Sequence, residues 1–195
     1  FGGFIEGIAG YGTAVAIPAA IMISLGFSPM TAAMICLLAN STPTAFGTVG
    51  LPVTTMISNF GLNAQQTALF TSLLLLLLTC VIPFILVVFA NKEIDGGKNP
   101  AFGKGILPVV IASIIGYMIQ PLIAMTTGAE LPTIISSLIA MILMIVATKM
   151  FVKAEEGFET VAVSTKDAIL AWLPYILMVV LIVGTSPVVK VINEP

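Results

Sequence analysis

The chain has 195 residues, of which 58% are hydrophobic and only 8% are charged, and its formal net charge is −2. Soluble domains carry about 25% charged residues, so this composition excludes a water-soluble globular protein and predicts an all-α polytopic membrane protein. The small net charge gives no reason to expect a nucleic-acid partner. The chain also lacks histidine, so we expect no metal site, no cofactor and no enzymatic activity.

Glycine and proline interrupt the first 57 residues at two places. The first interruption covers residues 7–13 and the second covers residues 40–50. Several glycines in so short a stretch oppose a continuous helix, and the second interruption also contains Pro43. We therefore expect helix to resume over residues 14–25 and from Pro52 onward.

Four later segments are apolar enough to cross a bilayer: residues 67–90, 106–127, 131–148 and 168–184. Lysines gather in the connections 91–105 and 149–167, whereas the connections between the other spans carry none. The positive-inside rule therefore places loops 91–105 and 149–167 in the cytoplasm.

Irregular backbone at membrane depth is tolerated only where it is buried in protein or lines a cavity, and paired interruptions point to the binding site of a transporter. A half-helix exposes unpaired N–H groups at its N-terminus, which hold an anion without a cationic side chain. This suits a chain without arginine. Neutral hydrogen-bonding side chains surround the two interruptions: Thr13, Asn40, Ser41, Thr42, Thr44 and Thr48. The alternative is structural, since glycine and threonine also allow helices to pack closely, as in Gly3-x-x-x-Gly7.

Glu6 is the only charged side chain among the first 91 residues. Burial favours the neutral form of a carboxyl group, and a carboxyl group that gains and loses a proton could couple a proton gradient to transport. The alternative is a neutral glutamic acid that bonds a neighbouring helix, or one that lies at a wet helix end.

Two strings resemble a known family. They are Glu6-Gly7-Ile8-Ala9-Gly10-Tyr11-Gly12-Thr13 and Asn40-Ser41-Thr42-Pro43-Thr44-Ala45-Phe46-Gly47-Thr48-Val49-Gly50-Leu51-Pro52. Both resemble the bacterial L-lactate permease family, which includes glycolate permeases, and the resemblance continues to Trp172-Leu173-Pro174-Tyr175. One departure is Ala14, where the family string often has proline.

The resemblance implies proton-driven symport of lactate or glycolate across the bacterial inner membrane, by an internal portion of a longer protein. It also implies one inverted repeat of a secondary transporter. Residues 1–27 would form the tip and second arm of a re-entrant hairpin, and residues 30–57 a broken transmembrane helix. The two interruptions would then meet midway through the bilayer. The expected substrate-binding residues are Gly10, Tyr11, Gly12, Thr13, Asn40, Ser41, Thr42, Thr44, Gly47 and Thr48, with Glu6 as the proton-coupling residue.

A cation channel is the alternative function. Gly10-Tyr11-Gly12 matches the centre of the potassium-filter string, although Ile8 and Ala9 replace the threonine and valine that precede it there. A filter would not need the second interruption. A membrane enzyme or a structural subunit is a third possibility.

Overall fold

The computed structural model describes residues 1–10, 12–96, 101–103, 105–152 and 164–185. Within these residues all regular secondary structure is helical, which confirms the all-α prediction. The chain divides into two units, Phe1–Lys153 and Ala154–Pro195. The second unit contains helix α9 (Thr165–Thr185), which we describe by itself.

Two short helices occupy the N-terminal region, α1 (Gly2–Ile8) and α2 (Thr13–Ser24). Gly10 and Gly12 between them have φ angles of 56° and 89°. These left-handed conformations are open to glycine and stop a right-handed helix. The first predicted interruption is therefore the link between α1 and α2, and the two helices pack against each other.

The second predicted interruption separates α3 (Pro29–Asn40) from η1 (Pro43–Phe46) and α4 (Gly47–Phe60). The two halves of this segment are bent by 59°. Inside α4, Thr48, Val49 and Gly50 have φ angles of 46°, 58° and 72°. A left-handed conformation costs about 1–2 kcal/mol for a residue with a Cβ, so this turn depends on the packing around it.

Four longer or paired helices follow: α5 (Ala64–Asp95), α6 (Ile106–Met118), α7 (Gln120–Thr127) and α8 (Pro132–Phe151). Three spans are long and apolar enough to cross a membrane, namely Ala64–Ile94, Ile106–Thr127 and Pro132–Phe151. The segment formed by α3, η1 and α4 is bent, and it gives a fourth candidate span if it crosses the membrane as one broken helix. Large apolar side chains such as Leu74, 79% exposed, face outward, as expected for an integral membrane protein.

Two predicted spans differ in detail. Residues 106–127 form α6 and α7, which are separated at Ile119, just before the Gln120-Pro121 pair. The span predicted at residues 168–184 lies within α9. The apolar part of α9, Trp172–Ile182, is shorter than the three helices that are long enough to cross a membrane.

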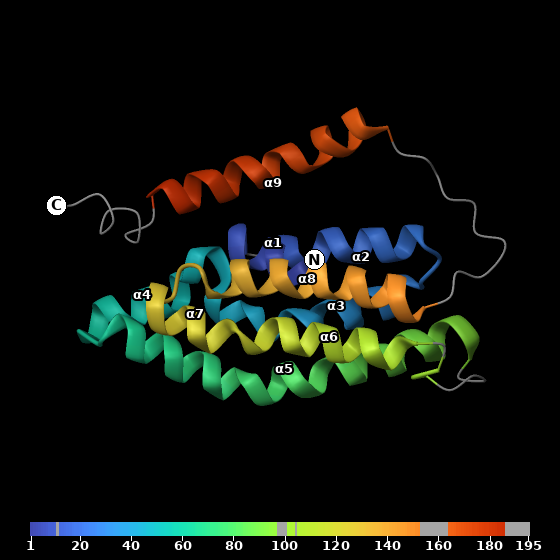
Figure 1. Cartoon of the computed structure of the whole chain (residues 1–195), viewed down its shortest axis with the longest axis horizontal. Helices are drawn as coiled ribbons and strands as arrows, with labels where there is room; N and C mark the ends of the chain where they lie inside the picture. Colours follow the sequence, from blue (N-terminus) through green and yellow to red (C-terminus); the bar gives the residue numbers. More distant parts are fainter. Residues whose placement is uncertain (11, 97–100, 104, 153–163, 186–195) are drawn as a thin grey trace. The chain divides into compact units, whose positions relative to one another are not determined.

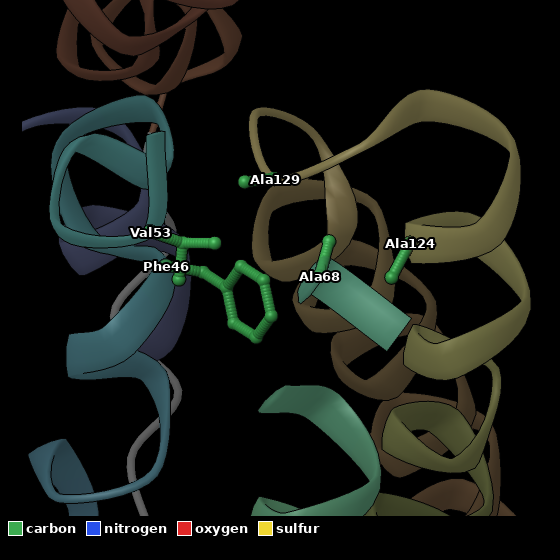
Figure 2. Close-up of a cluster of buried hydrophobic side chains, with 5 residues drawn as sticks. All are labelled: Phe46, Val53, Ala68, Ala124 and Ala129. Carbon is green, nitrogen blue, oxygen red and sulfur yellow. The ribbon is translucent and has the colours of Figure 1, made fainter. Parts of the chain in front are cut away.

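Within residues 1–153, α6 packs along α8, α2 along α3, and α5 against α7 (Figure 1). The broken segment packs against this scaffold through one buried hydrophobic cluster. The cluster consists of Phe46, Val53, Ala68, Ala124 and Ala129. The Phe46 ring points toward Ala68 of α5 and Ala124 of α7 (Figure 2). Small partners let the broken segment approach α5 and α7 closely.

Helix lengths give the distance of the two interruptions from the link between α2 and α3. α2 and α3 have 12 residues each, so each spans about 18 Å at 1.5 Å per residue. Both interruptions therefore lie about 18 Å from the link that joins α2 to α3.

The end of α5 holds the start of α3. Glu93 accepts hydrogen bonds from the Ser28 N–H and the Thr31 hydroxyl group, each at 2.9 Å. Ser28 also caps α3 by accepting from the Thr31 N–H at 3.3 Å. The near half of the broken segment is thus anchored to the longest helix.

Candidate functional site

A cavity of about 450 Å³ lies where the two interruptions come together. It is bordered by the α1–α2 link, the end of α3 and the start of α4. The residues that line it are Glu6, Gly12, Asn40, Thr44, Gly47, Thr48, Leu51, Pro52 and Thr55. This volume accommodates a small carboxylate together with water.

The two interruptions touch directly. The Thr48 hydroxyl group donates to the Ala9 carbonyl oxygen at 3.4 Å. A Cβ at Gly10 would overlap the Thr48 hydroxyl oxygen and lie 3.3 Å from the Thr48 Cβ. Gly10 is therefore needed both for its positive φ and for this close approach.

Two helices begin at the cavity without a side-chain cap. Gly12 is the N-cap of α2 and Phe46 is the N-cap of α4, and at neither N-terminus does a capping side chain accept a hydrogen bond from the helix N–H groups. Several of the first N–H groups are already bonded to nearby backbone: the Thr13 N–H donates to the Gly10 carbonyl oxygen at 3.2 Å, the Val15 N–H to the Gly12 carbonyl oxygen at 3.1 Å, and the Gly47 N–H to the Thr44 carbonyl oxygen. Of the two, only α2 begins as a regular right-handed helix at the cavity, because Thr48, Val49 and Gly50 at the start of α4 are left-handed.

Glu6 is buried beside these helix starts, with 4% of its surface exposed. A Cβ at Gly47 would overlap one Glu6 carboxyl oxygen and lie 3.1 Å from the Glu6 Cδ. The other carboxyl oxygen, Oε2, is buried and has no hydrogen-bond partner. The cavity therefore contains an unsatisfied carboxyl oxygen.

Asn40 and Thr44 form a hydrogen-bonded pair across the end of α3. The Asn40 amide nitrogen donates to the Thr44 hydroxyl oxygen at 3.3 Å, and the Thr44 hydroxyl group donates to the Asn40 carbonyl oxygen. The Asn40 side-chain oxygen, Oδ1, is buried without a partner.

The structure brings six of the predicted site residues to the cavity wall: Glu6, Gly12, Asn40, Thr44, Gly47 and Thr48. Gly10 supports the wall through Thr48. The hydroxyl groups of Thr13 and Ser41 donate instead to the backbone carbonyls of Gly10 and Leu38, each at 2.6 Å. Thr42 lines a separate cavity of about 290 Å³ that also includes Gly3 and Tyr117. Tyr11 lies outside the described residues.

Sequence reasoning did not select Leu51, Pro52 or Thr55, which complete the cavity wall. Thr55 lies one helical turn after Leu51, so the two residues share one face of the helix. Because helix was predicted from Pro52 onward, this shared face could have indicated Thr55. Sequence reasoning also did not find the polar layer behind α1. There Gln120 donates to Thr133 at 3.2 Å, and a Cβ at Gly7 would lie 2.8 Å from the Ile134 Cγ1.

Comparisons with known proteins identify the family of this chain. The L-lactate permease family profile matches residues 1–194. An L-lactate permease of Streptococcus iniae is 43% identical over 200 residues, covering 100% of this chain and 40% of that protein. An L-lactate permease of Halalkalibacterium halodurans is 38% identical over 189 residues, covering 91% of this chain and 34% of that protein.

A glycolate permease of Escherichia coli is 32% identical over 143 residues, covering 73% of this chain and 24% of that protein. No solved structure matches the chain. The chain thus spans less than half the length of these relatives. The match along the whole chain shows that the protein belongs to the L-lactate permease family.

Proposed function

We propose that this protein takes part in carrying a small 2-hydroxycarboxylate, lactate or glycolate, across the bacterial inner membrane by symport with protons. The names of the relatives support this substrate class. The observation that carries the proposal is the cavity at which the two interruptions meet beside a buried carboxyl group.

In this proposal the substrate carboxylate accepts hydrogen bonds from backbone N–H groups of the two interruptions, which line the cavity at Gly12 and Thr48. Its 2-hydroxyl group bonds the polar side chains of Asn40, Thr44 and Thr48, which line the same cavity. The remaining predicted residues, Gly10, Tyr11, Gly12, Thr13, Ser41, Thr42 and Gly47, shape or adjoin the site.

Glu6 is the proposed proton-coupling residue. An ionised Glu6 and a bound carboxylate would be two negative charges inside one cavity, which repel each other. Protonation of Glu6 removes this repulsion, so a proton binds before or with the substrate. Release of the proton on the far side then lowers the affinity for the substrate. This order couples the movement of the proton to the movement of the substrate.

The lysine distribution supports a cytoplasmic position for loops 91–105 and 149–167. The Glu93 end of α5 and the α2–α3 link would then face the cytoplasm, and α1 and α2 would form a hairpin that enters from that side. Residues 1–57 would supply one half of a site in an inverted-repeat transporter. The comparisons offer no support for the channel alternative.

Uptake into vesicles that contain the full-length protein tests this proposal. An inward proton gradient is expected to drive accumulation of lactate or glycolate, and Thr44→Val with Thr48→Val is expected to weaken uptake. Accumulation that ignores the proton gradient would refute symport. Unchanged uptake by the double variant would refute the site, and ohmic potassium current would favour the channel.

A further inference from the structure

We propose that the second cavity, of about 290 Å³, is a second binding position for the transported carboxylate, where the Tyr117 hydroxyl group receives it. This inference rests on the proposed function, because it gives a second position to the same substrate. Three features of the cavity support it: the wall that it shares with the first cavity, the end of the unit toward which it extends, and two hydroxyl groups without partners.

A thin wall separates the second cavity from the first cavity, which contains Glu6. Along the turn from α3 to η1, Asn40 and Thr44 line the first cavity, whereas Ala39 and Thr42 line the second. α1 also contributes to both, with Glu6 on the first cavity and its first turn on the second. Because residues that are adjacent in sequence line different cavities, the wall between them is one backbone segment thick.

The two cavities extend toward opposite ends of the unit that contains them. The first cavity follows α4 as far as Thr55, toward the end where α4 leads into α5. The second cavity follows α5 as far as Val87 and reaches Ile106, the first residue of α6. At that end Glu93 of α5 holds the start of α3. In the proposed topology, the second cavity therefore leads from the shared wall toward the cytoplasm.

The polar groups of the second cavity are hydroxyl groups among apolar side chains. They belong to Thr42, Thr79, Ser113 and Tyr117. Thr79 and Ser113 donate to carbonyl oxygens of their own helices, at 3.0 and 2.7 Å. The hydroxyl groups of Thr42 and Tyr117 bond no other residue among those that the structure describes. These two O–H donors are thus free for an acceptor in the cavity, and an apolar lining with few polar groups is typical of small-molecule sites.

Gly3 allows the Tyr117 hydroxyl group to lie at the shared wall. A Cβ at Gly3 would overlap the Tyr117 hydroxyl oxygen and lie 3.7 Å from the Pro43 Cβ. The hydroxyl oxygen therefore lies against α1 and close to the turn that carries Thr42. A carboxylate that enters the cavity past this turn meets two O–H donors, and hydrogen bonds to an ionised group are about twice as strong as neutral ones. The volume of about 290 Å³ accommodates a small hydroxycarboxylate together with water.

Protection of an introduced thiol by substrate tests the second position in the full-length protein. Cys36 and Cys80 are replaced by alanine, and Ser113→Cys places a thiol in the second cavity. Lactate is expected to slow modification of this thiol by a small cationic methanethiosulfonate. Ile115→Cys is the matched control on the outward face of α6, where the side chain is 55% exposed. That thiol would face lipid, so it should react slowly and without protection by lactate.

Tyr117→Phe removes only the hydroxyl group that is proposed to bind the substrate. Combined with Ser113→Cys, it should raise the lactate concentration for half-maximal protection about 10- to 150-fold, the loss expected for one hydrogen bond to a charged group. Combined with Leu51→Cys, a thiol in the first cavity, it should leave that concentration unchanged. A merely structural role for Tyr117 would change both concentrations or neither. Val109→Cys, which lines the second cavity, takes the place of Ser113→Cys if that variant fails to fold.

The outcomes separate the second position from the proposed function. Lactate that protects Leu51→Cys but neither thiol of the second cavity would overturn the second position alone. A half-maximal concentration for Ser113→Cys that Tyr117→Phe leaves in place would overturn the role of Tyr117. Loss of protection at every thiol, in the first cavity as well as the second, would overturn the proposed substrate site too.

Discussion

Replacing Glu6 by glutamine tests the electrostatic reasoning most sharply. The change keeps the size of the side chain and removes its charge. A compact cavity of about 450 Å³ is roughly 9.5 Å across, so an anion in it lies within about that distance of Glu6. Two like charges at roughly 9.5 Å repel by about 1.7 kcal/mol when the effective dielectric constant is 20.

This repulsion corresponds to roughly a 20-fold difference in affinity. Glu6→Gln is therefore expected to bind lactate at least about 20-fold more tightly than wild type at a pH where Glu6 is ionised, and equally well at low pH. Binding should lose its pH dependence. Accumulation driven by a proton gradient should disappear, whereas exchange of labelled for unlabelled lactate should continue.

Equilibrium binding to purified full-length protein, together with exchange and accumulation in vesicles, measures all three effects. Glu93→Gln is the matched control, because it removes a carboxylate that does not line the cavity. The reasoning would be refuted if Glu6→Gln retained proton-driven accumulation, or if it bound lactate no better than wild type at high pH.

Three further predictions follow from the packing. Gly47→Ala places a methyl group on the Glu6 carboxyl oxygen, so overpacking of about 1–3 kcal/mol should lower the thermal unfolding midpoint. Gly184→Ala, which meets no atom within 4 Å, should not lower it, and an equal loss in the two variants would contradict the contact. Val49→Gly should raise the thermal unfolding midpoint. It relieves about 1–2 kcal/mol of left-handed strain, which exceeds the 0.5–1 kcal/mol entropic cost of glycine. Val49→Ala keeps the strain, so a similar rise in that variant would argue against this explanation. Glu93→Ala removes two hydrogen bonds at the start of α3 and should lower the melting temperature, with partial recovery in Glu93→Gln; an unchanged melting temperature would show that this anchor is not needed.

Much of the fold was predictable because lipid imposes strong rules. Long apolar runs gave the spans within α5 and α8, and glycine and proline marked where helices stop. The positive φ angles at Gly10 and Gly12 also agree with local composition, because glycine adopts this conformation readily. Local composition was sufficient for these features because each depends on neighbours in the sequence.

The left-handed turn at Thr48 and Val49 could not be predicted. Both residues are β-branched, and their side chains oppose that conformation. Tertiary contacts override the local preference there: Thr48 bonds Ala9, and a Cβ at Gly50 would overlap the Ala129 backbone. No periodic pattern encodes such contacts.

The site was only partly predictable for a similar reason. Sequence indicated that hydroxyl groups lie near both interruptions, but not which of them remain free. Thr13 and Ser41 bond nearby backbone carbonyls, whereas Thr44 and Thr48 line the cavity. The approach of Gly47 to Glu6 joins two segments that no local signal connects.

Protection of one cysteine by substrate tests the central claim most directly. The native Cys36 and Cys80 are replaced by alanine, and Thr44→Cys places a thiol in the exposed wall of the cavity. Lactate is expected to slow alkylation of Thr44→Cys by a small polar reagent and to leave exposed Thr126→Cys on α7 unaffected. Alkylation of Thr44→Cys at the same rate with and without saturating lactate would contradict a substrate site at the meeting point of the two interruptions.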